Sequence, residues 1–346
     1  MGASSDKCEL AIQLDGTSFN AGGEVSGKVY LAVKETIESN TVWLKVKGVE
    51  KCDWKKRPSD ANRGTKARHY NMGVKIPLFN FDTVSIVPGQ YTFPFAFMLP
   101  ENLPGSFKVK RKSYSAEIMY KVKAEIAPSN DKCYKKSAPF TVKQVITEER
   151  YSVSLEKSAQ IVTCKCLNKG TTSIKAHLDK NAYLPTERAN IIIEADNSMC
   201  HVPIKTIEVT LWRTLRLRSN KDNVFYVRDA LKTFKTGSVP PSTGLLSQNA
   251  IKVEVPFTDL KENIEDICST KGNKIECAYS FQIRAVLGSI NDPSFEVWTL
   301  IHPMEMSPQI LEAPVDWTPT EMPQARLTID AAFNYFPSAP PMDDDS

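Results

Sequence analysis

The stretch "SFKVKRK", residues 106–112, holds four cationic residues within five positions. If strand geometry continues through it, Lys108, Lys110 and Lys112 project from one face and Arg111 extends the patch at its edge. Converging cations can hold a phosphorylated peptide or an anionic lipid head group. A lysine-rich strand edge that discourages pairing gives the same pattern. We therefore predict a phosphate or anionic-lipid patch here, with an ordinary solvated edge as the alternative.

The chain ends "FNYFPSAPPMDDDS", residues 333–346. Its prolines remove backbone donors and hold the chain extended, and an extended peptide loses little entropy when it docks. One tetrapeptide stands out as a peptide motif for a partner: Pro337, Ser338, Ala339 and Pro340. Ala339 is small enough for a narrow pocket, and Ser338 supplies a hydroxyl. We expect another protein to bind this motif.

Two alternatives remain for the same tail. Phe333 and Phe336 would pack back onto the first domain as an autoinhibitory latch, with the acidic run 343–345 against the basic patch. Otherwise the tail is simply disordered. The motif and the latch are compatible if bound cargo displaces the tail.

Residues typical of catalysis or metal binding are scattered. The sequence lacks GxSxG, GxGxxG, HExxH and Walker patterns, and the histidines are dispersed at positions 69, 177, 201 and 302. Cys164 and Cys166 would share a strand face, but no second ligand pair accompanies them. We expect no enzyme activity, metal or cofactor, unless His201, Cys200 and an acid converge in one cleft.

Composition indicates a cytoplasmic protein. The first residues, "MGASSDKCEL", lack the apolar core of a signal peptide, and no run of about 18 apolar residues occurs. The 44 basic and 40 acidic side chains give a net charge of +4, which favours no nucleic-acid partner. Gly2 raises the alternative of N-myristoylation, although Asp6 stands where a hydroxyl is usual.

Period-two alternation is the main structural signal. In "SAEIMYKVKAEI" the residues at 116, 118, 120, 122, 124 and 126 are inward, while Lys121 and Lys123 are outward. The same pattern places Val42, Leu44 and Val46 inward in "TVWLKVKGV". It recurs in 24–33, 173–180 and 207–217, and no long helical stripe occurs. The chain is therefore predicted to be all-β.

The chain also repeats itself. Aligning Glu24 with Glu187 gives an offset of 187 − 24 = 163, and aligning Ala124 with Ala285 gives 285 − 124 = 161. Two distant pairs with nearly equal offsets predict two copies of one β-sandwich. We place the first at residues 1–150, the second at 151–310 and a flexible Pro-rich tail at 311–346. The stretches 55–73 and 219–249 are expected to be long loops.

One segment is similar to a known family. "VPGQYTFPFAFMLPENLPGSF", residues 87–107, resembles the N-terminal domain of the arrestins. The stretches "AHLDKNAYLPTE", 176–187, and "ADNSMCHVPIKTIEVTLWR", 195–213, resemble the arrestin C-terminal domain. Thr186 departs from the usual glycine. The resemblance covers about residues 8–306 and implies two tandem arrestin-type immunoglobulin-like sandwiches, closest in character to the α-arrestins.

The resemblance also implies a function. An α-arrestin is a non-enzymatic adaptor that binds membrane-protein cargo or phosphorylated receptor tails and links them to endocytic and endosomal sorting. "PSAP" resembles the P-[ST]-A-P motif that engages the ubiquitin-variant domain of an ESCRT-I subunit. No PPxY motif for a ubiquitin ligase is present. The alternative is a coat subunit that resembles the arrestin-fold subunit of retromer.

Overall fold

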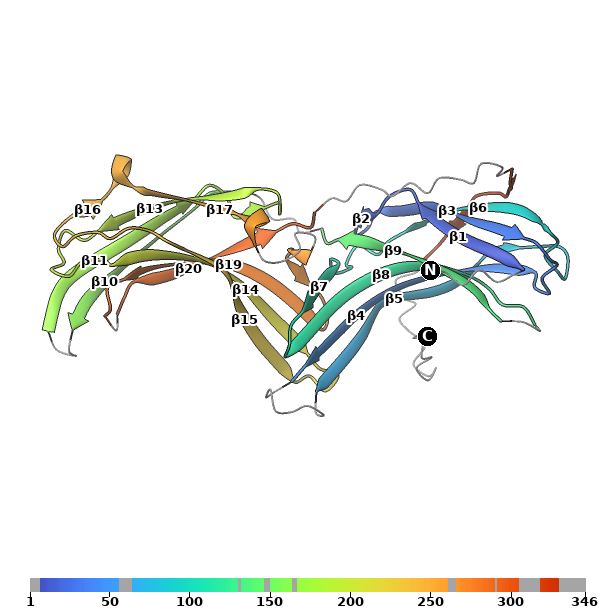
Figure 1. Ribbon diagram of the computed structural model, residues 1–346, viewed down its shortest axis with the longest axis horizontal. Coiled ribbons are helices and arrows are strands. Elements are labelled where there is room, and N and C mark those ends of the chain that lie inside the picture. Colours follow the sequence, from blue (N-terminus) through green and yellow to red (C-terminus); the bar gives the residue numbers. More distant parts are fainter. Residues whose placement is uncertain are drawn as a thin grey trace.

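Two β-sandwiches lie end to end in an elongated molecule (Figure 1). The computed structural model describes residues 7–55, 64–129, 132–145, 150–163, 167–260, 266–289, 291–304 and 318–329. Apart from the 3₁₀ turns η1 (Ser247–Asn249) and η2 (Phe257–Asp259), the regular elements of these residues are all strands. The predicted all-β class and the tandem sandwiches are confirmed.

The first sandwich consists of two mainly antiparallel sheets. One has the order β1-β3-β6-β21, with β22 also on β6; the other has the order β2-β9-β8-β4-β5, with β7 on β8. Their bounds are β1 (Cys8–Leu14), β2 (Ser18–Asn20), β3 (Glu24–Val33), β4 (Thr41–Trp54), β5 (Thr65–Asn80), β6 (Gly89–Met98), β7 (Phe107–Lys110), β8 (Tyr114–Ile126), β9 (Tyr134–Lys143), β21 (Thr320–Glu321) and β22 (Ala325–Leu327).

The second sandwich repeats this plan. Its sheets have the orders β10-β11-β13-β16, with β17 on β13, and β12-β20-β19-β14-β15, with β18 on β19. Their bounds are β10 (Val153–Thr163), β11 (Leu167–Leu178), β12 (Ala182–Tyr183), β13 (Arg188–Asp196), β14 (Thr206–Arg218), β15 (Val224–Lys235), β16 (Gly244–Leu245), β17 (Ile251–Pro256), β18 (Thr270–Lys271), β19 (Ile275–Val286) and β20 (Ser294–Ile301).

Alternation accounts for the cores. The six residues predicted inward on β8 are all buried, as are Val42, Leu44 and Val46 on β4. Phe93, Phe95 and Phe97 on β6 fill the space between the two sheets at 0–2% exposure. Burial of the apolar face against the opposite sheet therefore fixes which side of each strand faces solvent.

The sandwiches meet through a buried carboxylate. Glu50 of β4 is fully buried and accepts backbone hydrogen bonds from Asn273 (2.9 Å), Lys274 (2.7 Å) and Ile275 (3.0 Å) of the second sandwich. A side chain at Gly272 would place its Cβ 2.6 Å from a Glu50 oxygen, so only glycine fits there. We call this contact the Glu50 clasp.

Aromatic and charged groups extend the same junction. Trp54 of β4 stacks on Phe225 of β15 with ring centroids 5.7 Å apart. The Tyr114 hydroxyl donates to Asp229, whose carboxylate also pairs with buried Arg213 at 2.7 Å. Burial, followed by the hydrogen bond to Asp229, raises the pKa of Tyr114 to about 12. The two domains therefore share apolar, hydrogen-bonded and ionic contacts.

Two stretches expected to be loops contain long strands. β5 begins at Thr65, inside the predicted loop 55–73, and β15 spans 224–235, inside the predicted loop 219–249. Both lie at the ends of their sheets. Their side chains are more exposed and more charged than those of central strands, which weakens the alternating apolar signal. The sequence reading was wrong here.

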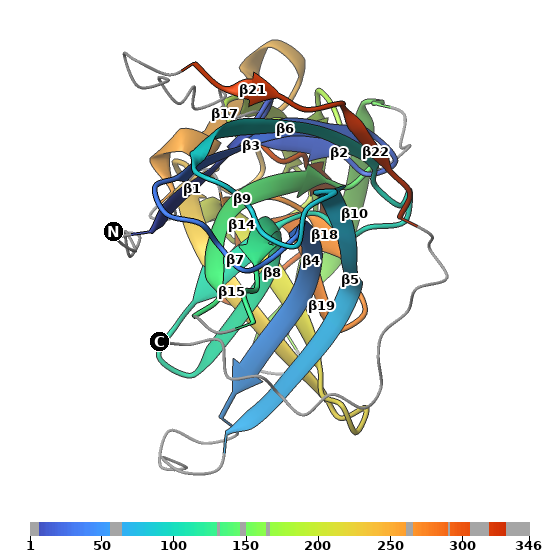
Figure 2. The same ribbon diagram turned by 90° about the vertical axis from the view of Figure 1, so that its right-hand side faces the viewer.

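Part of the predicted tail joins the first sandwich. β21 pairs in parallel with β6 at Tyr91 and Thr92, and β22 pairs with β6 at 95–97 (Figure 2). Met322, Ala325 and Leu327 pack on the core. Residues 318–329 are therefore docked rather than free, because they satisfy the open edge of β6. Phe333, Phe336 and the 337–340 motif lie outside the described residues.

A cationic hollow as the candidate functional site

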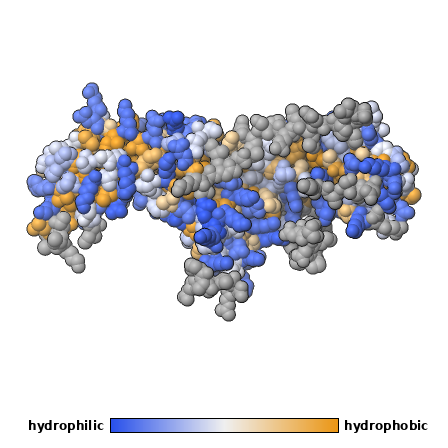
Figure 3. Space-filling view, viewed as in Figure 1, coloured by the Kyte–Doolittle hydropathy of each residue, from blue (hydrophilic) through white to orange (hydrophobic). Residues whose placement is uncertain are grey.

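A hollow of about 640 Å³ opens on the first sandwich beside the domain junction. Its walls come from β4, β5, β7 and β8, and Asn220 of the second sandwich closes one side. Five cationic side chains line it: Lys51, Lys66, Arg68, Lys108 and Lys110. Hydrophilic residues dominate the lower centre of the molecule, where β4, β5 and β15 converge (Figure 3). We call this site the cationic hollow.

Strand register brings these cations together. Lys51 stands opposite Arg68 of β5 and Glu117 of β8, and Glu117 stands opposite Lys108 of β7. In the next row, Lys66 and Lys110 flank Asp53 and Ser115 in the same way. Directly opposed residues of antiparallel strands point to the same side of a sheet. The hollow is therefore a property of the pairing of four strands.

The hollow carries an excess of positive charge. Its acidic lining residues are Asp53 and Glu117, against five cations. Lys108 lies 3.9 Å from Glu117, but the two acids offset only two of the five cations. An anion entering the hollow would meet cations on several sides, which is the arrangement that phosphate recognition requires.

Cys52 lies in the same lining but is no nucleophile. Burial, and then the nearby charge of Glu50, raise the pKa of its thiol to about 11. The thiolate is the reactive form, and it is scarce at neutral pH when the pKa is this high. Burial therefore keeps Cys52 mainly in its neutral thiol form beside the cations.

The predicted basic patch is placed in part. Lys108 and Lys110 line the hollow, but β7 ends at Lys110, so Lys112 does not continue the strand. Arg111 is exposed, and its guanidinium donates to the Lys110 carbonyl at 3.0 Å. The assumption of strand geometry through residue 112 was therefore wrong. The turn at 112–113 carries the chain into β8.

Sequence reasoning missed Lys51, Lys66 and Arg68. Their signal was present, because Lys51 and Asp53 alternate with buried Cys52 and Trp54, and Lys66 and Arg68 flank buried Ala67. What could not be read was the register between β4 and β5, since a long connection joins them and does not fix which residues stand opposite each other.

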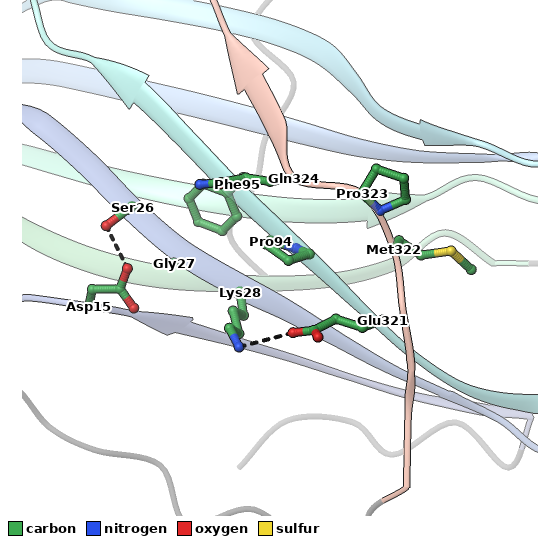
Figure 4. A pocket seen from close by; sticks show the side chains of 10 residues that line it. All are labelled: Asp15, Ser26, Gly27, Lys28, Pro94, Phe95, Glu321, Met322, Pro323 and Gln324. Atoms are coloured by element: carbon green, nitrogen blue, oxygen red, sulfur yellow. Dashed lines mark hydrogen bonds and ion pairs between the residues drawn. The ribbon is translucent and has the colours of Figure 1, made fainter.

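A second hollow forms where the tail crosses β3 and β6. It is lined by Asp15, Ser26, Gly27, Lys28, Pro94, Phe95, Glu321, Met322, Pro323 and Gln324 (Figure 4). Lys28 pairs with Glu321 at 3.3 Å, but both side chains are well exposed. Such a pair contributes at most about 1 kcal/mol. The tail therefore depends on backbone pairing and apolar contacts more than on this ion pair.

The histidines and cysteines that the structure describes do not assemble into a site. Cys200 is buried and the adjacent His201 is exposed, while His69 contacts Asn273 and His177 faces solvent. Within the described ranges, no group of three or more His, Cys, Asp or Glu side chains could hold a metal ion. Cys164 and Cys166 lie outside those ranges. In the same ranges, no helix is both long and apolar enough to span a bilayer.

Fold and site together define a tandem β-sandwich protein with an open, cationic binding hollow. Residues 8–149 match the family described as arrestin (or S-antigen), N-terminal domain, and residues 168–305 match its C-terminal domain. The chain belongs to the arrestin family, as the sequence resemblance predicted.

Two relatives are named arrestin domain-containing proteins. Protein A of Dictyostelium discoideum is 28% identical over 224 residues, which cover 60% of this chain and 38% of the relative. Protein 5 of Bos taurus is 25% identical over 218 residues, which cover 59% of this chain and 62% of the relative. The chain thus spans less than two thirds of either relative.

Proposed function

We propose that this protein is a non-enzymatic adaptor that binds phosphorylated cytoplasmic tails of membrane-protein cargo or receptors at the cationic hollow. It would act in the cytoplasm and be recruited peripherally to the plasma membrane or endosomes, where it links cargo to sorting machinery. The observation that carries the proposal is the gathering of five cations around one open hollow. Membership of the arrestin family is consistent with an adaptor.

The dimensions of the hollow favour a peptide phosphate. Its volume of about 640 Å³ falls in the range of ligand pockets. Arg68 supplies a planar guanidinium fork and the lysines supply rotatable ammonium groups, which together suit a doubly charged phosphate. Lys66 and Lys110 stand on either side of the Asp53–Ser115 pair, so a phosphate placed between them would contact both.

The link to sorting rests on the end of the chain. In our proposal, Pro337, Ser338, Ala339 and Pro340 bind the ubiquitin-variant domain of an ESCRT-I subunit. A peptide of residues 330–346 should bind that domain with Kd on the order of 10–100 μM in fluorescence anisotropy. Pro340→Ala should abolish binding, and an absence of binding to the unaltered peptide at millimolar domain would overturn the link.

Cargo binding can be tested with the full-length protein. A fluorescent peptide with two phosphoserines should bind measurably more tightly than its unphosphorylated form. The double substitution Lys66→Gln and Lys110→Gln should lower the affinity for the phosphopeptide by at least tenfold. The matched control is Lys157→Gln with Lys252→Gln, two exposed lysines of the second sandwich that change the net charge equally. Equal losses in both double variants would show a nonspecific charge effect and refute the hollow as the site.

A further inference from the structure

The same sheet carries a second cationic surface. The row formed by Tyr70, Val49 and Met119 is uncharged and separates this surface from the hollow. Beyond it, three consecutive rows across β5, β4, β8 and β9 hold six lysines, at positions 45, 47, 75, 121, 123 and 135. Glu125 is the one carboxylate in these rows. We call this surface the lysine field.

The field brings like charges face to face. Lys45 stands opposite both Lys75 and Lys123, and Lys47 stands opposite Lys121. Like charges directly opposed across strands are destabilising. These rows therefore concentrate positive charge on one face of the sheet.

Glu125 offsets only part of this charge. It lies 2.8 Å from the Lys45 ammonium, 3.4 Å from Lys75 and 3.5 Å from Lys123, and its side chain is 9% exposed. Burial opposes its ionisation, but the hydrogen bond from Lys45 and the three ammonium charges lower the pKa of the carboxyl below its usual value. Glu125 is therefore charged at neutral pH, and it is the one carboxylate beside the six lysines in these three rows.

The second sandwich provides an internal comparison. Its corresponding strands β14, β15, β19 and β20 also turn one face to solvent, but several arginines there are paired with acids. Arg216 pairs with Glu276 at 3.1 Å and Arg228 pairs with Glu296 at 2.5 Å. A lysine excess is thus not a general property of the outer sheet face in this fold.

We propose that the lysine field docks this protein onto an anionic membrane leaflet. Adjacent strands about 4.8 Å apart and rows about 7 Å apart make the field roughly 14 Å on each side. Lysine is a compact, hydrated point charge that suits delocalised attraction to lipid head groups, whereas a single phosphate is better held by converging donors.

Aromatic side chains accompany the lysines. Trp43 lies in the same rows beneath Lys75, whose ammonium is 4.5 Å from its ring centroid, and Tyr70 borders the field beneath Lys47 at 5.0 Å. Tryptophan and tyrosine favour the interface between water and lipid. This inference does not depend on phosphopeptide binding in the hollow, because different side chains carry it.

Vesicle flotation with the full-length protein tests the proposal. The protein should float with phosphatidylcholine vesicles that contain about 30 mol% phosphatidylserine, and not with phosphatidylcholine alone. Binding should fall steeply as NaCl rises from about 0.05 M to about 0.3 M. Lys47→Gln with Lys121→Gln should weaken binding roughly 25-fold, since each lysine near an anionic surface contributes about fivefold.

Three comparisons keep the result unambiguous. Lys47 and Lys121 oppose each other, so their replacement removes repulsion, and an unchanged melting temperature would show that the fold is retained. Glu125→Gln should tighten vesicle binding severalfold. Lys157→Gln with Lys252→Gln should leave vesicle binding within about twofold.

The outcomes separate this inference from the proposed function. If anionic vesicles do not bind the protein, or if the Lys47/Lys121 and Lys157/Lys252 variants lose affinity equally, the membrane role is wrong. If the Lys47/Lys121 variant instead loses phosphopeptide binding and keeps vesicle binding, the field is a peptide site. Both proposals are supported if phosphopeptide binding is lost only in the Lys66/Lys110 variant and vesicle binding is lost only in the Lys47/Lys121 variant.

Discussion

Replacing Glu50 by glutamine should loosen the junction between the two sandwiches. Glu50 accepts three backbone hydrogen bonds. One carboxylate oxygen accepts the N–H groups of Lys274 and Ile275, and the other accepts that of Asn273. A glutamine can keep its one carbonyl oxygen there, but its amide group then faces the Asn273 N–H, which is also a donor. One charge-assisted bond is lost and two become neutral, which costs about 3 kcal/mol.

Amide hydrogen exchange measures this effect directly. If residues 273–275 exchange through local opening, a loss of about 3 kcal/mol should accelerate their exchange roughly 100-fold. Peptides from the two cores should change much less, because those strands open with the whole domain. Gly272→Ala should act in the same direction, since the new Cβ would collide with the Glu50 carboxylate.

The control is Glu24→Gln, which removes an exposed acid from β3 of the first sandwich. It should leave exchange of residues 273–275 unchanged. If Glu50→Gln accelerates these amides less than about threefold, the clasp does not hold the junction and the reasoning fails. An equal acceleration in the Glu24 variant would also refute it, because the effect would then come from net charge.

Two further predictions concern the tail and pH. Leu327→Asp places a charge where Leu327 pairs with Phe97 and packs on the core, so amide exchange of residues 325–329 should rise to the rate of an unpaired segment; retained protection would contradict the docking. Burial opposes ionisation of Glu187, but hydrogen bonds from Lys180 and Leu184 lower its pKa. Its contribution to the free energy of unfolding is therefore complete above about pH 4.3, and it is lost as the pH falls through the pKa of the folded state. The difference in melting temperature between wild type and Glu187→Gln should therefore shrink below about pH 4.3, and a constant difference would argue against this role.

Alternation in the sequence was enough to predict the all-β class, and the internal repeat predicted the two sandwiches. Alternation assigned the inward and outward faces of β4 and β8 correctly, including Lys45, Lys47, Lys121 and Lys123 as outward. It could not show that β4 and β8 are neighbours in one sheet, because residues 55–113 separate them. The lysine field therefore became visible only with the register.

Other features had signals that were harder to interpret. Glu50 occupies an inward position of β4, and a charged residue in an inward position implies a buried partner, but its partners are backbone groups some 220 residues away. Little in the sequence indicated that residues 320–327 dock on the first sandwich, because backbone pairing with β6 requires few particular side chains. The register between distant strands and the main-chain contacts could therefore not be predicted from the sequence.

The two copies share an alternating pattern of buried inward positions and differ in their outward residues. Both use the same strand order in the sheet that faces the junction, but the first carries the cationic hollow and lysine field where the second carries paired arginines and acids. The docked strands β21 and β22 lie on the opposite sheet of the first sandwich, against β6. These two strands therefore do not cover the lysine field. In the proposed binding, the main role of the second sandwich is to hold the junction, where the backbone of residues 273–275 binds Glu50 and Phe225 stacks on Trp54.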